Sequence, residues 1–256
     1  MANLIIRSVL VNGSSRGIGL ELVKAFLFKQ GPPVQSIFAA CRNPDSAQEL
    51  KSLSSKHSNL ATVRLDVTNP TSIEDACSDI TERLNGRGLN LLINNAGIAV
   101  FHSLYEATAE DMMEMYKTNT IGPMLVTQAF FPLLKKAAQE NPNEVKSCSK
   151  AAVINISSGA ASIERTPLEF SVQPLFEYRC SKAALNMLTR CQAEVYKTDG
   201  IIAVTVAPGW VQTDMGGPKA PLKPHDSVGS MMKVFDTLTE KHNGMFLNRK
   251  GQTLPW

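Results

Sequence analysis

Short, almost wholly apolar segments alternate with longer amphipathic segments along the whole chain of 256 residues. The apolar segments are predicted as strands at 4–11, 36–41, 61–67, 90–94, 151–156, 201–206 and 244–247. Strands that are apolar throughout, rather than alternating with polar residues, favour a parallel sheet covered on both faces. Their alternation with helices indicates βαβ units. We therefore predict an α/β fold, a doubly wound parallel sheet of about seven strands with helices on both faces.

Helical periodicity and capping signals place the intervening helices. The helices are predicted at 18–30, 70–84, 108–136, 176–197 and 226–241. Asn69-Pro70 supplies an N-cap with proline at the first helical position, and Thr108-x-x-Asp111 resembles a capping box. Residues 139–150 are polar and predict an exposed loop, and 216–224 predicts a mobile loop over the site. With no repeat or linker, residues 1–256 are predicted as one domain.

Charge and targeting signals exclude several classes of protein. The net charge is +3 and no block of five or six like charges occurs, so nucleic-acid and membrane-surface binding receive no support. No signal peptide is recognisable, and no apolar segment approaches the roughly 18 residues that span a bilayer. A cytoplasmic protein is expected. The five cysteines lack Cys-x-x-Cys spacing and the four histidines lack metal-ligand spacing, so we expect reduced thiols and no metal site.

A glycine-rich turn follows the first predicted strand and opens the first helix. It reads Asn12-Gly13-Ser14-Ser15-Arg16-Gly17-Ile18-Gly19. Glycines allow a tight turn, and they let backbone N–H groups approach a pyrophosphate at the helix N-terminus, as in a Rossmann-type fold. The alternative is an ordinary strand-to-helix turn. We predict cofactor contacts from Gly13, Ser15, Arg16, Gly17, Ile18 and Gly19.

The end of the second strand indicates which dinucleotide binds. NAD-binding folds usually place an acid there to hold the ribose 2′-hydroxyl, but this chain reads Ala40-Cys41-Arg42-Asn43, with no acid before Asp45. Arg42, together with Arg16, could clamp a 2′-phosphate, which predicts NADP(H). The alternative is that both arginines are solvated surface residues. Ligands bind at the carboxyl ends of such strands, so contacts are also predicted from Asp66, Val67, Asn95, Ala96 and Gly97.

Tyr178 and Lys182 lie four residues apart on a predicted helix, so their side chains share one face. A phenol beside an ammonium group is a proton donor, and we expect its pKa to be lowered. Together with the glycine turn, Asn94-Asn95-Ala96-Gly97 and Asn155-Ile156-Ser157-Ser158, the pair predicts a nicotinamide-dependent reductase. Cys180 lies between the two residues, where Lys182 could favour its thiolate.

These motifs, with Asn119 and Pro208-Gly209-Trp210-Val211-Gln212-Thr213, occur in the order typical of the short-chain dehydrogenase/reductase family, which the chain resembles over nearly its whole length. Within that family it is similar to the sniffer-type carbonyl reductases and the bacterial C-factor-like proteins. The supporting segments include Lys56-His57-Ser58-Asn59 and the ending Leu254-Pro255-Trp256.

The resemblance implies a role for each matching residue. Tyr178 would be the general acid, Lys182 would hold the nicotinamide ribose, Ser158 would donate to the substrate carbonyl and Asn119 would hold a water in a proton relay. Further cofactor contacts would come from Pro208, Gly209, Val211 and Thr213, besides Tyr178 and Lys182. The family also implies a homodimer or homotetramer through the 111–136 and 176–197 helices.

Two features depart from the family pattern. Asn12 stands where a threonine is usual, and we expect only a small effect. The interval from Ser158 to Tyr178 is long, so Ser157 is an alternative catalytic serine, and the extra residues at 164–174 are expected in the substrate wall. The predicted function is NADPH-dependent reduction of a small aldehyde, ketone or quinone. The alternatives are an NADP-dependent dehydrogenase of a specific alcohol, such as a steroid, and a regulator that binds NADPH without turnover.

Overall fold

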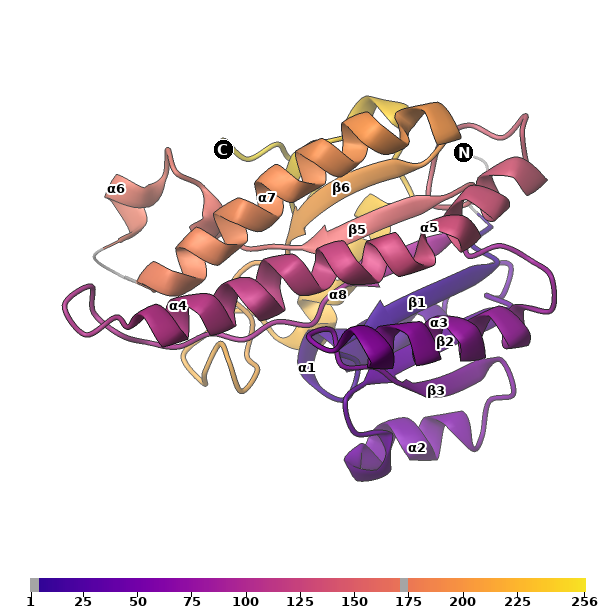
Figure 1. Cartoon of the computed structure of the whole chain (residues 1–256), viewed down its shortest axis with the longest axis horizontal. Helices are drawn as coiled ribbons and strands as arrows, with labels where there is room; N and C mark the ends of the chain where they lie inside the picture. Colours follow the sequence, from indigo (N-terminus) through magenta and orange to yellow (C-terminus); the bar gives the residue numbers. More distant parts are fainter. Residues whose placement is uncertain (1–4, 171–174) are drawn as a thin grey trace.

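The computed structural model describes residues 5–170 and 175–256, and their strands form one parallel sheet of seven (Figure 1). The strand order is β3-β2-β1-β4-β5-β6-β7, and every pairing between neighbours is parallel. The strands are β1 (Ser8–Asn12), β2 (Ser36–Cys41), β3 (Leu60–Arg64), β4 (Leu91–Asn94), β5 (Ala152–Ile156), β6 (Ile202–Ala207) and β7 (Phe246–Asn248). The predicted doubly wound architecture is confirmed.

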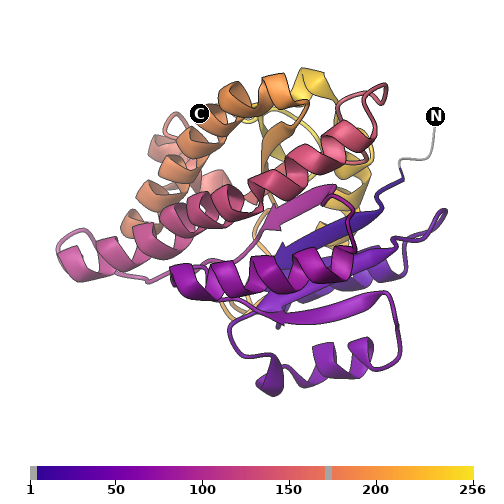
Figure 2. The ribbon, with the colours of Figure 1, turned by 45° about the vertical axis from the view of Figure 1, so that its right-hand side comes forward.

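Helices connect the strands and cover both faces of the sheet (Figures 1 and 2). They are α1 (Gly17–Leu27), α2 (Gln48–Ser54), α3 (Pro70–Leu84), α4 (Ala109–Tyr116), α5 (Gly122–Glu140), α6 (Thr166–Glu169), α7 (Phe176–Tyr196) and α8 (Pro224–Phe235). Within the described part of the chain, no helix combines the length and the apolar character needed to cross a bilayer.

Successive residues of each central strand enter opposite cores, which explains why the strands are apolar throughout. In β1, Val9 and Val11 pack in the core beneath α1 and α8, whereas Leu10 packs in the core beneath α3, α5 and α7. Both sets of side chains are fully buried. The alternation follows from the period of two along a strand. Because helices cover both faces of the sheet, a ligand is expected to bind at the carboxyl ends of the strands.

Several element boundaries agree with the sequence and others do not. The second strand has the predicted bounds, and Asn69 caps α3 by accepting a hydrogen bond from the Ser72 N–H at 3.1 Å. The first strand begins only at Ser8, and Leu4 lies outside the described residues. The last helix ends at Phe235 instead of 241, because Thr239 starts a separate one-turn helix with its own capping box.

Two predicted segments have a different conformation. The long helix predicted at 108–136 is interrupted by a π-helical turn, η2 (Lys117–Ile121), and then continues to Glu140. The predicted exposed loop at 139–150 is wrong in its second half, where Cys148 is fully buried. Lys150 can also be buried there because its ammonium donates to the carbonyls of Pro142 and Glu144. The short helices α2 and α6 had not been predicted.

A chain of buried side-chain amides crosses the three central strands at their carboxyl ends. Asn12 Nδ2 donates to Asn94 Oδ1 at 2.8 Å, and Asn94 Nδ2 donates to Asn155 Oδ1 at 2.9 Å. Asn155 Nδ2 in turn donates to Thr189 Oγ1 and Gln192 Oε1 on α7, at 2.8 and 2.9 Å. The network therefore aligns the ends of β1, β4 and β5 and ties them to the helix that carries Tyr178.

Replacing the central amide should destabilise the protein. Asn94→Ala leaves buried polar groups of Asn12 and Asn155 without their partner, at a cost of about 3 kcal/mol in the free energy of unfolding. Urea unfolding measures the loss. Asn43→Ala, at an exposed position, is the control and should change stability by less than about 0.5 kcal/mol. Equal stabilities of the two variants would contradict a structural role for the network.

Candidate active site

The glycine turn between β1 and α1 packs directly on the turn that follows β4. Gly13 has φ of +65°, and a Cβ there would lie 2.7 Å from the Ala96 Cα. A Cβ on Gly19 would lie 2.2 Å from the Gly13 carbonyl oxygen. Close contacts with the backbone therefore require glycine at both positions, and at Gly13 the positive φ requires it as well. The result is a backbone turn at the N-terminus of α1, the position where such folds bind a pyrophosphate.

Two asparagines hold these turns together. Asn12 Oδ1 accepts hydrogen bonds from the backbone N–H groups of Asn95 and Ala96, at 2.9 and 2.8 Å. Asn95 Nδ2 donates in return to the carbonyls of Asn12 and Gly13, each at 3.1 Å. The Asn12 amide thus joins the end of β1 to Asn94 through its donor and to the turn after β4 through its acceptor. The small effect expected for asparagine in place of threonine stays a prediction.

A hollow of about 350 Å³ lies beside the ends of β2 and β3 and is lined by Arg42, Arg64 and Asp66, among others. Burial acts to raise the pKa of Asp66, but hydrogen bonds from the Thr68 N–H and hydroxyl, with the charge of Arg42, lower it overall. Arg64 is not among the predicted site residues, because the predicted strand at 61–67 places it in the interior of a strand. In the structure β3 ends at Arg64.

Arg16 occupies a different place from Arg42. Its guanidinium pairs with Asp214 at 3.0 Å, and both side chains are more than two-thirds exposed. An exposed pair of this kind contributes little, typically 0–1 kcal/mol, so Arg16 can leave Asp214 at low cost. It does not line the hollow that Arg42 lines. The joint clamp on a 2′-phosphate therefore stays a prediction and requires Arg16 to move.

A second cavity, of about 630 Å³, opens on the other side of the glycine turn. Most of the residues expected around the nicotinamide line it, namely Ile18, Ser158, Tyr178, Pro208, Gly209, Val211 and Thr213. The segment after β6 packs closely against the start of α1. A Cβ on Gly17 would lie only 3.3 Å from the Thr213 methyl group. The two hollows thus flank the glycine turn, as the two halves of a dinucleotide require.

The structure distinguishes the two adjacent serines. The Ser158 side chain forms a hydrogen bond with the Tyr178 phenol and accepts another from the Ala160 N–H at 3.2 Å. Ser157 is buried, and its hydroxyl lies 3.5 Å from the Lys182 carbonyl. Both serines border the cavity, but only Ser158 is bonded to Tyr178 within the described residues.

Burial dominates the titration of the Tyr178–Lys182 pair. Lys182 donates to the Ile156 carbonyl at 2.8 Å, and its Nζ lies 5.8 Å from the centre of the Tyr178 ring. Desolvation lowers the pKa of Lys182 to about 8. It raises the pKa of Tyr178 to about 12, although the Ser158 hydrogen bond acts in the opposite direction. The expected lowering of the phenol pKa is therefore wrong for the protein without a bound cofactor.

Asn119 lies in the π turn η2. Its Oδ1 accepts from the Ile98 N–H at 2.9 Å, and its Nδ2 donates to the Ile98 carbonyl and to Ser181 Oγ at 2.9 and 3.0 Å. A Cβ on Gly97 would meet both Asn119 Oδ1 and Lys182 Nζ, at 3.1 and 3.5 Å. Asn119 and Lys182 therefore meet at Gly97. Single π turns within helices occur frequently at functional sites.

The outer wall of the large cavity comes from two segments, one of which includes the short helix α6. Arg165 and Leu168 line it from the expected insertion, of which residues 171–174 lie outside the described residues. Trp210 and Met215 line it from the segment after β6. The predicted loop at 216–224 pairs with this segment, since the Gln212 N–H donates to the Leu222 carbonyl at 2.8 Å.

Cys180 is half-buried on α7 and has a free thiol. Burial, and then the nearby Glu177, raise the pKa of this thiol. The thiolate that Lys182 could favour is therefore opposed by burial and by Glu177.

Comparison with known proteins supports this geometry. A family model described as short chain dehydrogenase matches residues 7–222. The NADPH-bound carbonyl reductase from chicken fatty liver is 53% identical, with 100% of this chain and 96% of that chain covered and a TM-score of 0.95. The carbonyl reductase Sniffer of Drosophila melanogaster is 38% identical, with 98% and 100% covered and a TM-score of 0.93. The C-signal protein of Myxococcus xanthus is 36% identical, over 66% of this chain and 93% of its own.

The depressed pKa of Lys182 predicts a pH-dependent stability. Because the folded pKa is about 8 and the ordinary value 10.5, the unfolded chain binds the extra proton between these values, and stability rises with pH there. Relative to Lys182→Met, the wild-type free energy of unfolding should increase by about 2 kcal/mol from pH 7.5 to 9.5. The cysteine thiols ionise in the same range in the unfolded chain, but their contribution is common to both proteins and cancels in this difference. A constant difference across the range would contradict the depressed pKa.

Proposed function

The chain belongs to the short-chain dehydrogenase/reductase family, and from that premise we propose that it reduces a small aldehyde, ketone or quinone to the alcohol with NADPH. The observation that carries the proposal is the position of the Tyr178 phenol. It borders the large cavity, is hydrogen-bonded to Ser158 and has Lys182 close to its ring. Such an arrangement presents a proton donor and a second hydroxyl to a carbonyl oxygen in the cavity.

The residues around the glycine turn fit NADP(H). The turn leaves backbone N–H groups at the N-terminus of α1 for a pyrophosphate, and Arg42 and Arg64 supply positive charge at the adjacent hollow for a 2′-phosphate. The chicken carbonyl reductase, whose structure has NADPH bound, supports the same cofactor. When bound, NADPH supplies the hydride that reduces the carbonyl carbon.

In the proposed mechanism Tyr178 is the general acid. As the carbonyl carbon is reduced, negative charge develops on its oxygen, and the phenol donates its proton there while Ser158 donates a hydrogen bond to the same oxygen. A phenol with a pKa of about 12 is fully protonated at neutral pH and is still more acidic than an alcohol. Lys182 would hold the nicotinamide ribose, and Asn119 would hold a water from which a proton returns to Tyr178.

The raised pKa of Tyr178 argues against the first alternative, an NADP-dependent dehydrogenase of a specific alcohol such as a steroid. Oxidation of an alcohol needs Tyr178 as a phenolate base, and burial opposes that form in the protein. The second alternative is a regulator that binds NADPH without turnover. It does not require Ser158 to be bonded to Tyr178 beside an open cavity, so we favour the reductase.

The location and assembly of the protein also remain proposals. We propose a cytoplasmic protein that assembles as a homodimer or homotetramer through α4, α5 and α7. Met113 on α4 and Met187 on α7 are exposed, as is Ile121 in the π turn between α4 and α5. Sedimentation analysis of the purified protein tests the assembly, and a monomer at micromolar concentration would contradict it.

Removing the arginines should change cofactor preference. In Arg42→Ala and Arg16→Ala the Michaelis constant for NADPH should rise by roughly tenfold or more, since each charged hydrogen bond to phosphate contributes about 1.5–3 kcal/mol. The constant for NADH, which has no 2′-phosphate, should change little. Arg83→Ala, at the distal end of α3, is the matched control. Equal effects on both cofactors would contradict the assignment.

Removing the phenol oxygen should abolish most turnover. Tyr178→Phe should lower kcat by about 10²–10⁴-fold, the usual contribution of general acid catalysis, while NADPH binding measured by fluorescence stays within threefold. Tyr105→Phe is the control because that side chain is almost fully exposed. Turnover of the Tyr178 variant close to that of the wild type would exclude Tyr178 as the acid.

A further inference from the structure

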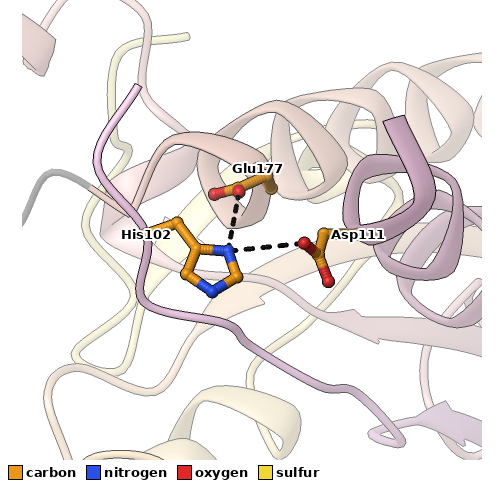
Figure 3. Close-up of side chains that lie close together, drawn as sticks. All are labelled: His102, Asp111 and Glu177. Atoms are coloured by element: carbon orange, nitrogen blue, oxygen red, sulfur yellow. Dashed lines mark ion pairs between the residues drawn. The ribbon is translucent and has the colours of Figure 1, made fainter. Parts of the chain in front are cut away.

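Three side chains that can ligate a metal converge beside the N-terminus of α7, outside the cavity described above (Figure 3). His102 comes from the segment between β4 and α4, Asp111 from the first turn of α4, and Glu177 from the first turn of α7. His102 Nδ1 lies 3.4 Å from Asp111 Oδ2 and 3.5 Å from Glu177 Oε1. The ligating atoms all lie within 4.8 Å of one another.

Glu177 points into this cluster without a hydrogen-bond donor. Its side chain is fully buried, and neither carboxylate oxygen has a hydrogen-bond partner in the described structure. His102 Nδ1 is likewise buried and unpartnered. A buried carboxylate without donors is costly, and proteins normally pair it with a cation or a metal. The cluster therefore lacks a positive charge at its centre.

A proton on His102 would supply one positive charge, but the distances from its ring nitrogen to the two carboxylates are too long for charge-assisted hydrogen bonds. The distances of 3.4 and 3.5 Å exceed the 2.7–2.9 Å of a charge-assisted hydrogen bond. Around a tetrahedral ion with bonds of about 2.1 Å, neighbouring ligand atoms lie about 3.4 Å apart. The two separations from the imidazole nitrogen match that value.

From this geometry we propose that His102, Asp111 and Glu177 form a binding site for a divalent transition-metal ion of the zinc type. Imidazole nitrogen and carboxylate oxygen are both common zinc ligands. Asp111 is already oriented, because its Oδ2 accepts a hydrogen bond from the Thr108 hydroxyl at 2.5 Å. His102 and Asp111 are partly exposed, so the ion has an entry path and water can complete its coordination.

The ion would join α4 to two elements that border the active site. Glu177 immediately precedes Tyr178, and the segment that carries His102 also carries Ala99 and Phe101, which line the large cavity. A bound ion would therefore fix one wall of the cavity to the N-terminus of α7. The ligands come from separate segments, with His102 and Glu177 75 positions apart in the sequence, so no ligand-spacing motif exists.

Isothermal titration of EDTA-treated protein with zinc chloride tests the site. The wild type should bind one ion per chain, and both His102→Ala and Glu177→Gln should bind at least about tenfold more weakly, as even the loss of a residue that only orients a ligand costs 10–100-fold. The matched control is His225→Ala, which removes an exposed histidine paired with Asp226 alone and should leave the affinity unchanged. Circular dichroism checks that each variant is folded.

Cobalt(II) identifies the ligands independently of affinity. Cobalt bound by nitrogen and oxygen gives only weak visible bands, whereas a bound thiolate adds an intense near-ultraviolet charge-transfer band. We expect no such band in the wild type, and we expect the visible bands to be lost in Glu177→Gln. A thiolate band, no stoichiometric binding, or equal zinc affinity in the wild type and both ligand variants would each overturn the proposal. None of these readouts depends on reductase activity.

Discussion

The site depends first on the buried amide chain that runs from Asn12 through Asn94 to Asn155. Parallel strands end at one edge of a sheet, but nothing in their backbone pairing fixes the loops that follow. The amide chain aligns three strand ends and, through Thr189 and Gln192, anchors α7 beside them. Because every donor and acceptor in it is desolvated, it tolerates only one arrangement. The amide chain thereby fixes the position of the glycine turn relative to α7, the helix that carries Tyr178.

Burial then determines the chemistry that this framework presents. The pocket removes water from both Tyr178 and Lys182, which favours the neutral form of each group. A protonated phenol is the form that reduction of a carbonyl requires. Glu177, the residue before Tyr178, is also fully buried, and its carboxylate has no hydrogen-bond donor among the described residues. One helix N-terminus therefore carries both the proposed acid and the proposed metal ligand.

The sequence predicted the architecture well, because apolar strands and capped helices are encoded locally, as in β2 and at Asn69. It also brought Ser158, Tyr178 and Lys182 together through their motifs. Helical periodicity could not reveal the π turn, which coincides with hydrogen bonds between Asn119 and Ile98, distant in sequence. Residue spacing showed that Lys182 neighbours Tyr178, but it carried no information on burial, so the predicted direction of the phenol pKa shift was wrong.

In the proposed reaction a hydride passes from NADPH to a carbonyl carbon in the cavity beside Tyr178. The most direct measurement follows deuterium from NADPH labelled at C4 of the nicotinamide on both faces, with aldehyde, ketone and quinone substrates. We expect a carbonyl substrate to be reduced at the rate at which NADPH is consumed, and we expect an aldehyde or ketone product to carry one deuterium on its carbinol carbon. NADPH consumed without deuterium at that carbon, or bound without being consumed by any substrate, would contradict the proposed reaction.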